Sequence, residues 1–174
     1  MSSLIKLNET IITSSTSSAT ITGISSDHDV HLLTVTNLKG TAHDQPIQCR
    51  ITQGGTAIST SDYDISHIRF IATGTPFTDR RYGGGSNWHF EFQDDTPAQS
   101  YGNWLMYLFN FNSTTNYASI SYQAIQIGRT SALNAPRGSA TFRGTGTAND
   151  GISFFQAAGG NIEEAELRLY GLKK

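Results

Sequence analysis

The stretch that decides the fold is GGNIEEAELRLYGLKK, residues 159–174 of the sequence. Its opening Gly-Gly-Asn tolerates positive φ angles and therefore predicts a tight turn. After this turn, Ala165, Leu167 and Leu169 alternate with polar or amphipathic residues, which is the two-residue period of a half-buried β-strand. A helix would also place the apolar residues of this segment on one face, but the flanking turn residues favour the strand.

The same alternation recurs along the rest of the chain, in short runs separated by Gly- and Asn-rich turns. Runs this short leave no room for helical crossovers, so the strands should pair antiparallel. We therefore predict an all-β fold, an antiparallel β-sandwich of jelly-roll type with about 8 to 11 strands in two sheets of about four or five, and little or no helix. The candidate strands are 4–12, 19–24, 30–38, 47–53, 63–71, 88–92, 104–111, 117–127, 139–143, 152–155 and 165–170.

Composition agrees with many strands and tight loops. The 174 residues fit one domain, and 19 serines and 21 threonines supply much of the polarity. Only 15% of residues are charged and the net charge is −2, which gives no electrostatic reason to bind nucleic acid or an anionic membrane. No stretch is long and apolar enough to predict membrane insertion.

The sequence predicts a single domain of residues 1–174, in which residues 1–18 form a possible N-terminal arm and hinge. The SSTSS at 14–18 is too polar to pack, whereas Leu4, Ile5 and Leu7 need an apolar surface to cover them. The arm either returns to its own sandwich, which local strand pairing favours, or reaches a neighbouring subunit. No secretory signal is recognisable, so we expect the chain to fold in a cytoplasm.

Cys49 lies in an alternating run and shares a face with Ile47 and Ile51. This pattern predicts a small core residue and not a reactive thiol. A single cysteine also allows no disulfide within the chain.

Asp27, His28, Asp29 and His31 lie within five residues and could supply nitrogen and oxygen ligands to a metal. A polar turn also explains them, and no third ligand cluster has suitable spacing, so we expect no metal. The acidic positions 62, 64, 94 and 95 do not form the twelve-residue calcium loop.

Catalytic motifs are absent from the sequence. The chain has no nucleophile elbow, no His-Glu-x-x-His and no phosphate-binding Gly-x-x-x-x-Gly-Lys loop. Glu91 with Asp94 or Asp95 could form the carboxylate pair of a glycosidase, but acidic residues in any β protein offer such pairs. We expect neither an enzyme nor a cofactor.

One candidate loop combines cations and aromatic rings: Arg80, Arg81, Tyr82, Asn87 and Trp88, around a flexible Gly83–Gly85 hairpin tip. Aromatic faces beside hydrogen-bonding groups suit a sugar-binding site. Arg, Tyr and Trp are also enriched at protein interfaces, and we favour an interface here.

The most apolar run, 103–111, is too short for a membrane helix. An exposed edge of this composition would aggregate. We predict a central strand with neighbours on both sides.

Several segments resemble small virion structural proteins of tailed bacteriophages, particularly marine and cyanobacterial ones. The C-terminal Gly-Asn-Ile turn and its closing Leu-Tyr-Gly-Leu-Lys are similar to the ends of those proteins. The resemblance implies a head, tail or fibre component with a structural role, while 80–88 and 136–143 match no pattern of the family. The further similar segments are 19–24 (ATITGI), 30–38 (VHLLTVTNL), 102–120 (GNWLMYLFNFNSTTNYASI) and 151–160 (GISFFQAAGG).

From this resemblance we expect a bacteriophage virion component, a capsid-decorating (cement) or fibre-type protein that is assembled in the host cytoplasm. It would act through protein–protein contacts with itself, a homotrimer being the first expectation, and with other virion proteins. The alternative is a carbohydrate-binding receptor-recognition module of a tail or fibre that holds a host surface glycan through Tyr82 and Trp88.

Overall fold

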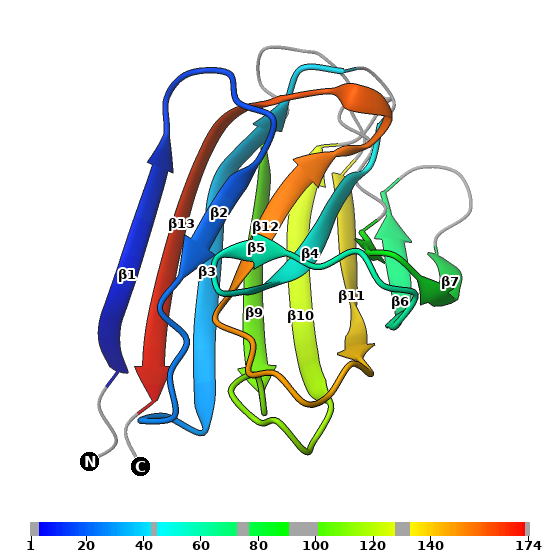
Figure 1. Cartoon of the computed structure of the whole chain (residues 1–174). Helices are drawn as coiled ribbons and strands as arrows, with labels where there is room; N and C mark the ends of the chain where they lie inside the picture. Colours follow the sequence, from blue (N-terminus) through cyan, green and yellow to red (C-terminus); the bar gives the residue numbers. More distant parts are fainter. Residues whose placement is uncertain (1–3, 43–44, 73–76, 91–100, 128–132, 173–174) are drawn as a thin grey trace.

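The computed structural model describes residues 4–42, 45–72, 77–90, 101–127 and 133–172, which form two antiparallel sheets packed face to face (Figure 1). The large sheet has eight strands in the order β1 (Leu4–Ile12), β13 (Ile162–Leu172), β3 (Val30–Gly40), β9 (Gly102–Phe109), β10 (Ala118–Ile127), β11 (Leu133–Phe142), β6 (Tyr63–Ile71) and β7 (Phe77–Gly85). The small sheet contains β2 (Ala19–Thr22), β12 (Gly151–Gln156), β4 (Ile47–Gln53) and β5 (Thr56–Ala57), and β8 (Trp88–His89) also pairs with β4.

The predicted antiparallel β-sandwich is confirmed, but the two sheets are unequal. Five strands cover only part of the face of the eight-stranded sheet (Figure 1). Sequence alternation missed β7, whose FTDRRYGGG has no apolar period and pairs with β6 through its backbone. The Gly83–Gly85 triplet, expected at a hairpin tip, is therefore the end of a strand.

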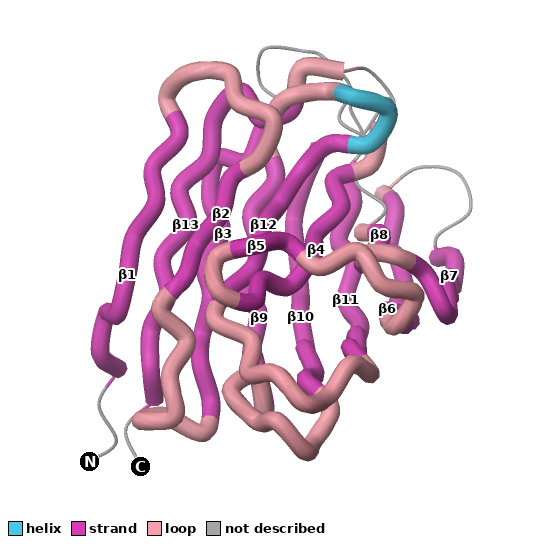
Figure 2. The backbone as a smooth tube through the Cα atoms, in the orientation of Figure 1, coloured by secondary structure: helices cyan, strands magenta, loops and turns pink. Residues whose placement is uncertain are grey.

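The only helix in the described part is a 3-10 turn, η1 (Ala157–Gly159), between β12 and β13 (Figure 2). Gly159 adopts φ of 77°, as the turn-forming Gly-Gly-Asn predicts, and Ala158 also has a positive φ of 54°. No helix among the described residues is long and apolar enough to span a membrane.

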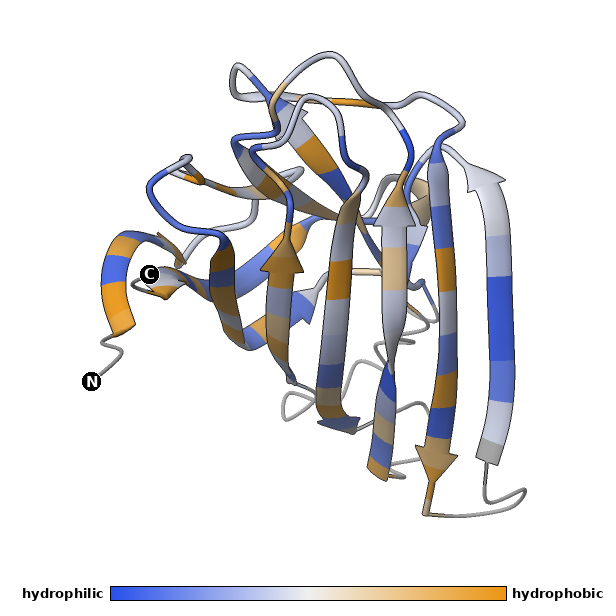
Figure 3. Cartoon of the chain, turned by 90° about the horizontal axis from the view of Figure 1, so that it is seen from below, coloured by the Kyte–Doolittle hydropathy of each residue, from blue (hydrophilic) through white to orange (hydrophobic). Residues whose placement is uncertain are grey.

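Strand alternation divides inner from outer residues, and Figure 3 shows it as alternating hydropathy bands along the strands. In β9, Trp104, Met106 and Leu108 point into the sandwich and are buried. This strand lies between β3 and β10, which confirms the prediction of a central strand with two neighbours.

Aromatic contacts join the two sheets across the core. Trp104 of the large sheet packs on Phe154 of the small one, with ring centroids 5.2 Å apart. The Tyr63 hydroxyl accepts a hydrogen bond from the Ile51 amide at 3.2 Å and donates one to the Ile58 carbonyl at 2.7 Å. Cys49 is fully buried, as predicted, and burial raises the pKa of its thiol.

The N-terminal arm folds back onto its own sandwich, which is the favoured of the two sequence-based alternatives. It forms β1, the edge strand beside β13, and Leu7 and Ile12 pack against the core. The polar segment after it is held by two backbone hydrogen bonds between Thr16 and Ile162, of 2.9 and 2.7 Å.

Candidate functional site

The candidate site is the outer face of the eight-stranded sheet, the face turned away from the small sheet. The small sheet buries the inner residues of the central strands, so every second residue is left on the outer side. In β9 these outer residues are Asn103, Tyr107 and Phe109, which are exposed, and Leu105, which is half-buried. The site is therefore built from residues that alternate with the core.

Strand register places three serines side by side across the outer face. Ser121 of β10 lies opposite Ser139 of β11, which lies opposite Ser66 of β6. On its other side Ser121 faces Tyr107 of β9. We call Ser121, Ser139 and Ser66 the serine row, and Tyr107 lies at its end.

The serine row forms the floor of a hollow of about 650 Å³. Serine side chains are short, whereas Tyr107, Ile68 and Arg137 at its margins are long, so the face is depressed between them. A second hollow of about 500 Å³ adjoins the first, because Leu105, Gln123 and Arg137 line both. Together they make one open depression across five strands, β3, β9, β10, β11 and β6.

Exposed apolar side chains border this depression. Tyr107 and Phe70 are each 40% exposed and present ring faces or edges to solvent. Such a concentration on one face of a monomer marks a binding surface more often than chance exposure does. The other exposed apolar residues at outer positions of β6, β9, β10 and β11 are Ile68, Phe109, Ile125 and Leu133.

Arg137 is the one charged side chain that lines the two hollows among the described residues. Its guanidinium lies over the Phe70 ring, 5.2 Å from the centroid, which is a cation–π contact. The remaining polar groups are hydroxyls and amides, including Gln123 and Asn103. This set offers stacking surfaces and hydrogen bonds around a single positive charge.

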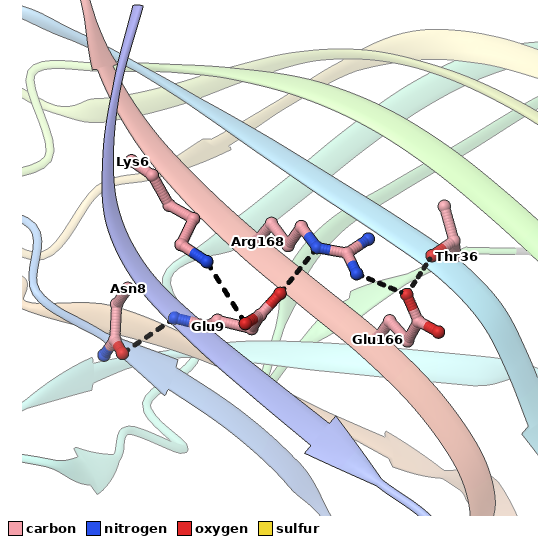
Figure 4. A network of polar contacts seen from close by, with 6 residues as sticks. All are labelled: Lys6, Asn8, Glu9, Thr36, Glu166 and Arg168. Atoms are coloured by element: carbon pink, nitrogen blue, oxygen red, sulfur yellow. Dashed lines mark hydrogen bonds and ion pairs between the residues drawn. The ribbon is translucent and has the colours of Figure 1, made fainter.

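A network of ion pairs covers the β1 side of the same face (Figure 4). Arg168 donates to Glu9 at 2.6 Å and to Glu166 at 2.7 Å, and Lys6 pairs with Glu9 at 3.2 Å. The Arg168 hydrogen bond, followed by that of Lys6, lowers the pKa of the Glu9 carboxyl. The Glu9 and Glu166 carboxylates are therefore already paired with cations of the same chain. Arg137 has no such ion pair among the described residues.

The sequence-predicted aromatic site is not one surface in the structure. Trp88 is fully buried and its indole donates a hydrogen bond to the Thr141 carbonyl at 3.1 Å, so it cannot stack on a ligand. The Tyr82 ring stacks on His89, with centroids 5.0 Å apart. Burial removes Trp88 from the side chains that could bind a partner there, because alternation alone does not show which side of β8 faces the core, and the role of the other residues stays a prediction.

The other residues of that predicted site are split between the two faces of β7 and the following bend. Arg81 lies opposite Ser66 and so extends the serine row at the sheet edge, whereas Arg80 lies opposite the buried His67. Asn87 is half-buried in the bend before β8.

The predicted interface residues of the arm lie at the β1 edge. Leu4 is 51% and Ile5 42% exposed, whereas Leu7 is partly buried against the core. Ile11, 54% exposed, adds to the apolar surface of this edge.

The His28 and His31 rings meet edge to face, 5.7 Å apart, with His31 buried. Burial, with a smaller contribution from His28, lowers the pKa of His31 to about 4. A hollow of about 200 Å³ beside them includes Asp29 and Asn112. The described residues contain no group of three or more His, Cys, Asp or Glu side chains placed to hold a metal.

Of the other acidic residues considered from the sequence, Asp64 has contacts within the fold and three lie outside the described residues. Asp64 forms an ion pair with Arg143 at 2.9 Å and accepts a hydrogen bond from the Gly84 amide. Glu91, Asp94 and Asp95 fall outside the described residues.

Sequence reasoning missed Ser66, Gln123, Arg137 and Ser139, because polar residues at alternate strand positions look like ordinary solvent-facing positions. For Ser66, Ser121 and Ser139 the available signal was their small size in three separate strands, whereas Gln123 and Arg137 gave no such signal. That signal becomes informative only when register places the serines in one row.

Comparison of the chain with protein-family models, with curated proteins and with solved structures found no match. The resemblance to bacteriophage virion proteins therefore stays a prediction from the sequence.

Proposed function

We propose that this chain is a non-enzymatic carbohydrate-binding domain of a bacteriophage virion, and that the outer face of its large sheet holds a host surface glycan. The proposal rests on the double hollow of about 650 and 500 Å³ with exposed rings and hydroxyl or amide side chains. The virion setting rests on the sequence resemblance. The glycan site differs in position from the Tyr82 and Trp88 site expected from sequence.

The chemistry of the lining supports binding. A pyranose presents C–H groups to an aromatic face and hydroxyls to polar side chains, which Tyr107 and the serine row offer together. Among the described lining residues there is no carboxylate, whereas glycoside hydrolysis ordinarily uses two. The site therefore has groups to hold a sugar and lacks the usual acid–base pair to cleave it.

A microarray of bacterial glycans, probed with the purified chain, tests this function. We expect binding to a subset of glycans, and Tyr107→Ala to weaken it about tenfold through loss of the stacking ring. Tyr117→Ala is the matched control, because Tyr117 is 53% exposed but lies outside both hollows. Binding to no glycan, or equal losses in the two variants, would contradict the proposal.

A second candidate function is assembly with like subunits, a trimer being expected, or with other virion proteins. The exposed apolar side chains of Leu4, Ile5 and Ile11 on an edge strand favour it, because strand edges pair readily with other chains. This edge lies away from the hollows, so one protein could use both surfaces.

Light scattering over a concentration series tests assembly. We expect a mass larger than one chain, reduced in Ile11→Lys, which introduces charge at the edge without removing a core contact. Ile68→Lys, a similar change at a 41% exposed position of the outer face, is the control. A concentration-independent monomer would exclude this candidate.

A further inference from the structure

Arg137 stands between the two hollows and lines both. It belongs to the row next to the serine row: Leu105 faces Gln123, Gln123 faces Arg137, and Arg137 faces Ile68. The next position of this row, beyond Ile68, is Asp79 on the edge strand β7. Register thus places Arg137 on the strand between Gln123 and Ile68, and Ile68 separates it from Asp79, the carboxylate of the same row.

Arg137 has no ion pair among the described residues, in contrast to Arg143 and Arg168, which pair with Asp64 and Glu9. Its planar group lies on the Phe70 ring, which limits the directions in which its N–H groups can point. A guanidinium held in this way presents a fork of donors that matches the two oxygens of a carboxylate.

We propose that the glycan bound on the outer face is acidic, and that the carboxylate of one of its sugar units binds Arg137 while another unit stacks on Tyr107. This inference rests on the proposed function. Gln123 lies between the two groups and can hydrogen-bond the connecting sugar, since its amide has both donor and acceptor atoms.

Spacing within the sheet favours an extended chain as the ligand. Tyr107 and Arg137 are two strands apart and one row apart, so their Cα atoms are separated by about 12 Å from ordinary strand and residue spacings. One pyranose ring does not cover this distance. A ligand that reaches both groups therefore contains at least two sugar units and crosses the strands.

The test compares each acidic glycan of the array with its carboxyl-reduced, neutral form, by microarray and then by calorimetric titration. We expect the native form to bind at least tenfold more tightly than the reduced form, with an affinity that falls as salt is added. Arg137→Gln should abolish this difference, and Arg137→Lys should retain part of it, because lysine keeps the charge but not the fork. Tyr107→Ala should weaken both forms equally.

Each alternative outcome has a distinct meaning. Equal binding of native and reduced glycans, unchanged by Arg137→Gln, overturns the acidic-ligand inference and leaves the carbohydrate-binding function standing. Binding to no glycan overturns both. If Tyr107→Ala lowers the solution mass of the chain instead, the face is an interface between copies, and both are again overturned. Unchanged melting temperatures of the variants show that these effects are not unfolding.

Discussion

At the scale of single residues, Gln156 shows how one buried amide can fasten a loop to the sandwich. Its Oε1 accepts a hydrogen bond from the Ala42 amide at 2.8 Å, and its Nε2 donates to the Ala42 carbonyl at 2.7 Å. Gly40 and Gly160 leave room for this side chain, because a Cβ at either position would overlap its amide group. The loop after β3 is thereby joined to the end of β12.

Gln156→Ala should destabilise the protein by about 2–3 kcal/mol, because it removes these hydrogen bonds and leaves a buried site unfilled. Chemical denaturation monitored by circular dichroism measures the change. Gln123→Ala is the control, since that glutamine is exposed on the outer face and should change stability by less than about 0.5 kcal/mol. Similar losses in both variants would refute the role of Gln156.

His31 makes stability depend on pH. Its pKa falls from 6.5 to about 4 on folding because burial disfavours the charged ring. The unfolded state therefore binds more protons between these values, so the contribution of neutral His31 is complete above about pH 6.5 and is lost progressively as pH falls toward 4.

We expect the melting temperature of the wild type to drop more between pH 7 and pH 5 than that of His31→Gln, which has no titrating ring. The interval lies above the usual carboxyl range, so most acidic residues stay ionised. Parallel pH dependence of the two proteins would show that another group is responsible.

At the scale of elements, β1 is the strand for which the structure differs most from the sequence-based expectation, which was an arm. As an arm, it would be dispensable for folding, and its removal would weaken mainly an oligomer. In the structure β1 completes the large sheet, with Glu9 paired to Arg168 and with Leu7 and Ile12 against the core.

Deletion of residues 1–12 should therefore lower the free energy of unfolding by about 3 kcal/mol or more, from loss of two partly buried apolar side chains and of one hydrogen-bonded ladder. Denaturant unfolding of this variant, beside one that lacks only residues 1–3, gives the difference. An unchanged midpoint in the longer deletion would mean that β1 behaves as a free arm.

At the scale of the whole molecule, the two sheets share one core and should unfold together. Trp88 pairs with the small sheet yet contacts Tyr63 of the large one, with ring centroids 5.2 Å apart. Trp104 makes the reciprocal contact with Phe154. Neither sheet can separate without exposing these rings.

Thermal unfolding followed by tryptophan fluorescence and by far-ultraviolet circular dichroism should therefore give coincident transitions. Phe154→Ala, which opens a space between the sheets, should lower both midpoints equally at a cost of about 3–5 kcal/mol. Two separated transitions would show that one sheet unfolds independently of the other.

The sequence by itself determined the fold class, the central strand, the buried Cys49 and the strand after the Gly-Gly-Asn turn. These follow from local properties, namely the two-residue period and the φ preferences of turn residues. Local strand pairing, the basis for expecting the arm on its own sandwich, does not describe its partner, since β1 pairs with β13 at the other end of the chain.

Only the tertiary structure decided which polar residues meet. Ser121 and Ser139 come from consecutive strands, but Ser66 comes from β6, which is far from them in the sequence, and Arg137 reaches Phe70 only through the pairing of β11 with β6. Local periodicity tells which residues share a side of one strand, but not strand order or register. Strand register brings the residues of the candidate site together, whereas alternation within each strand is enough to predict the fold class.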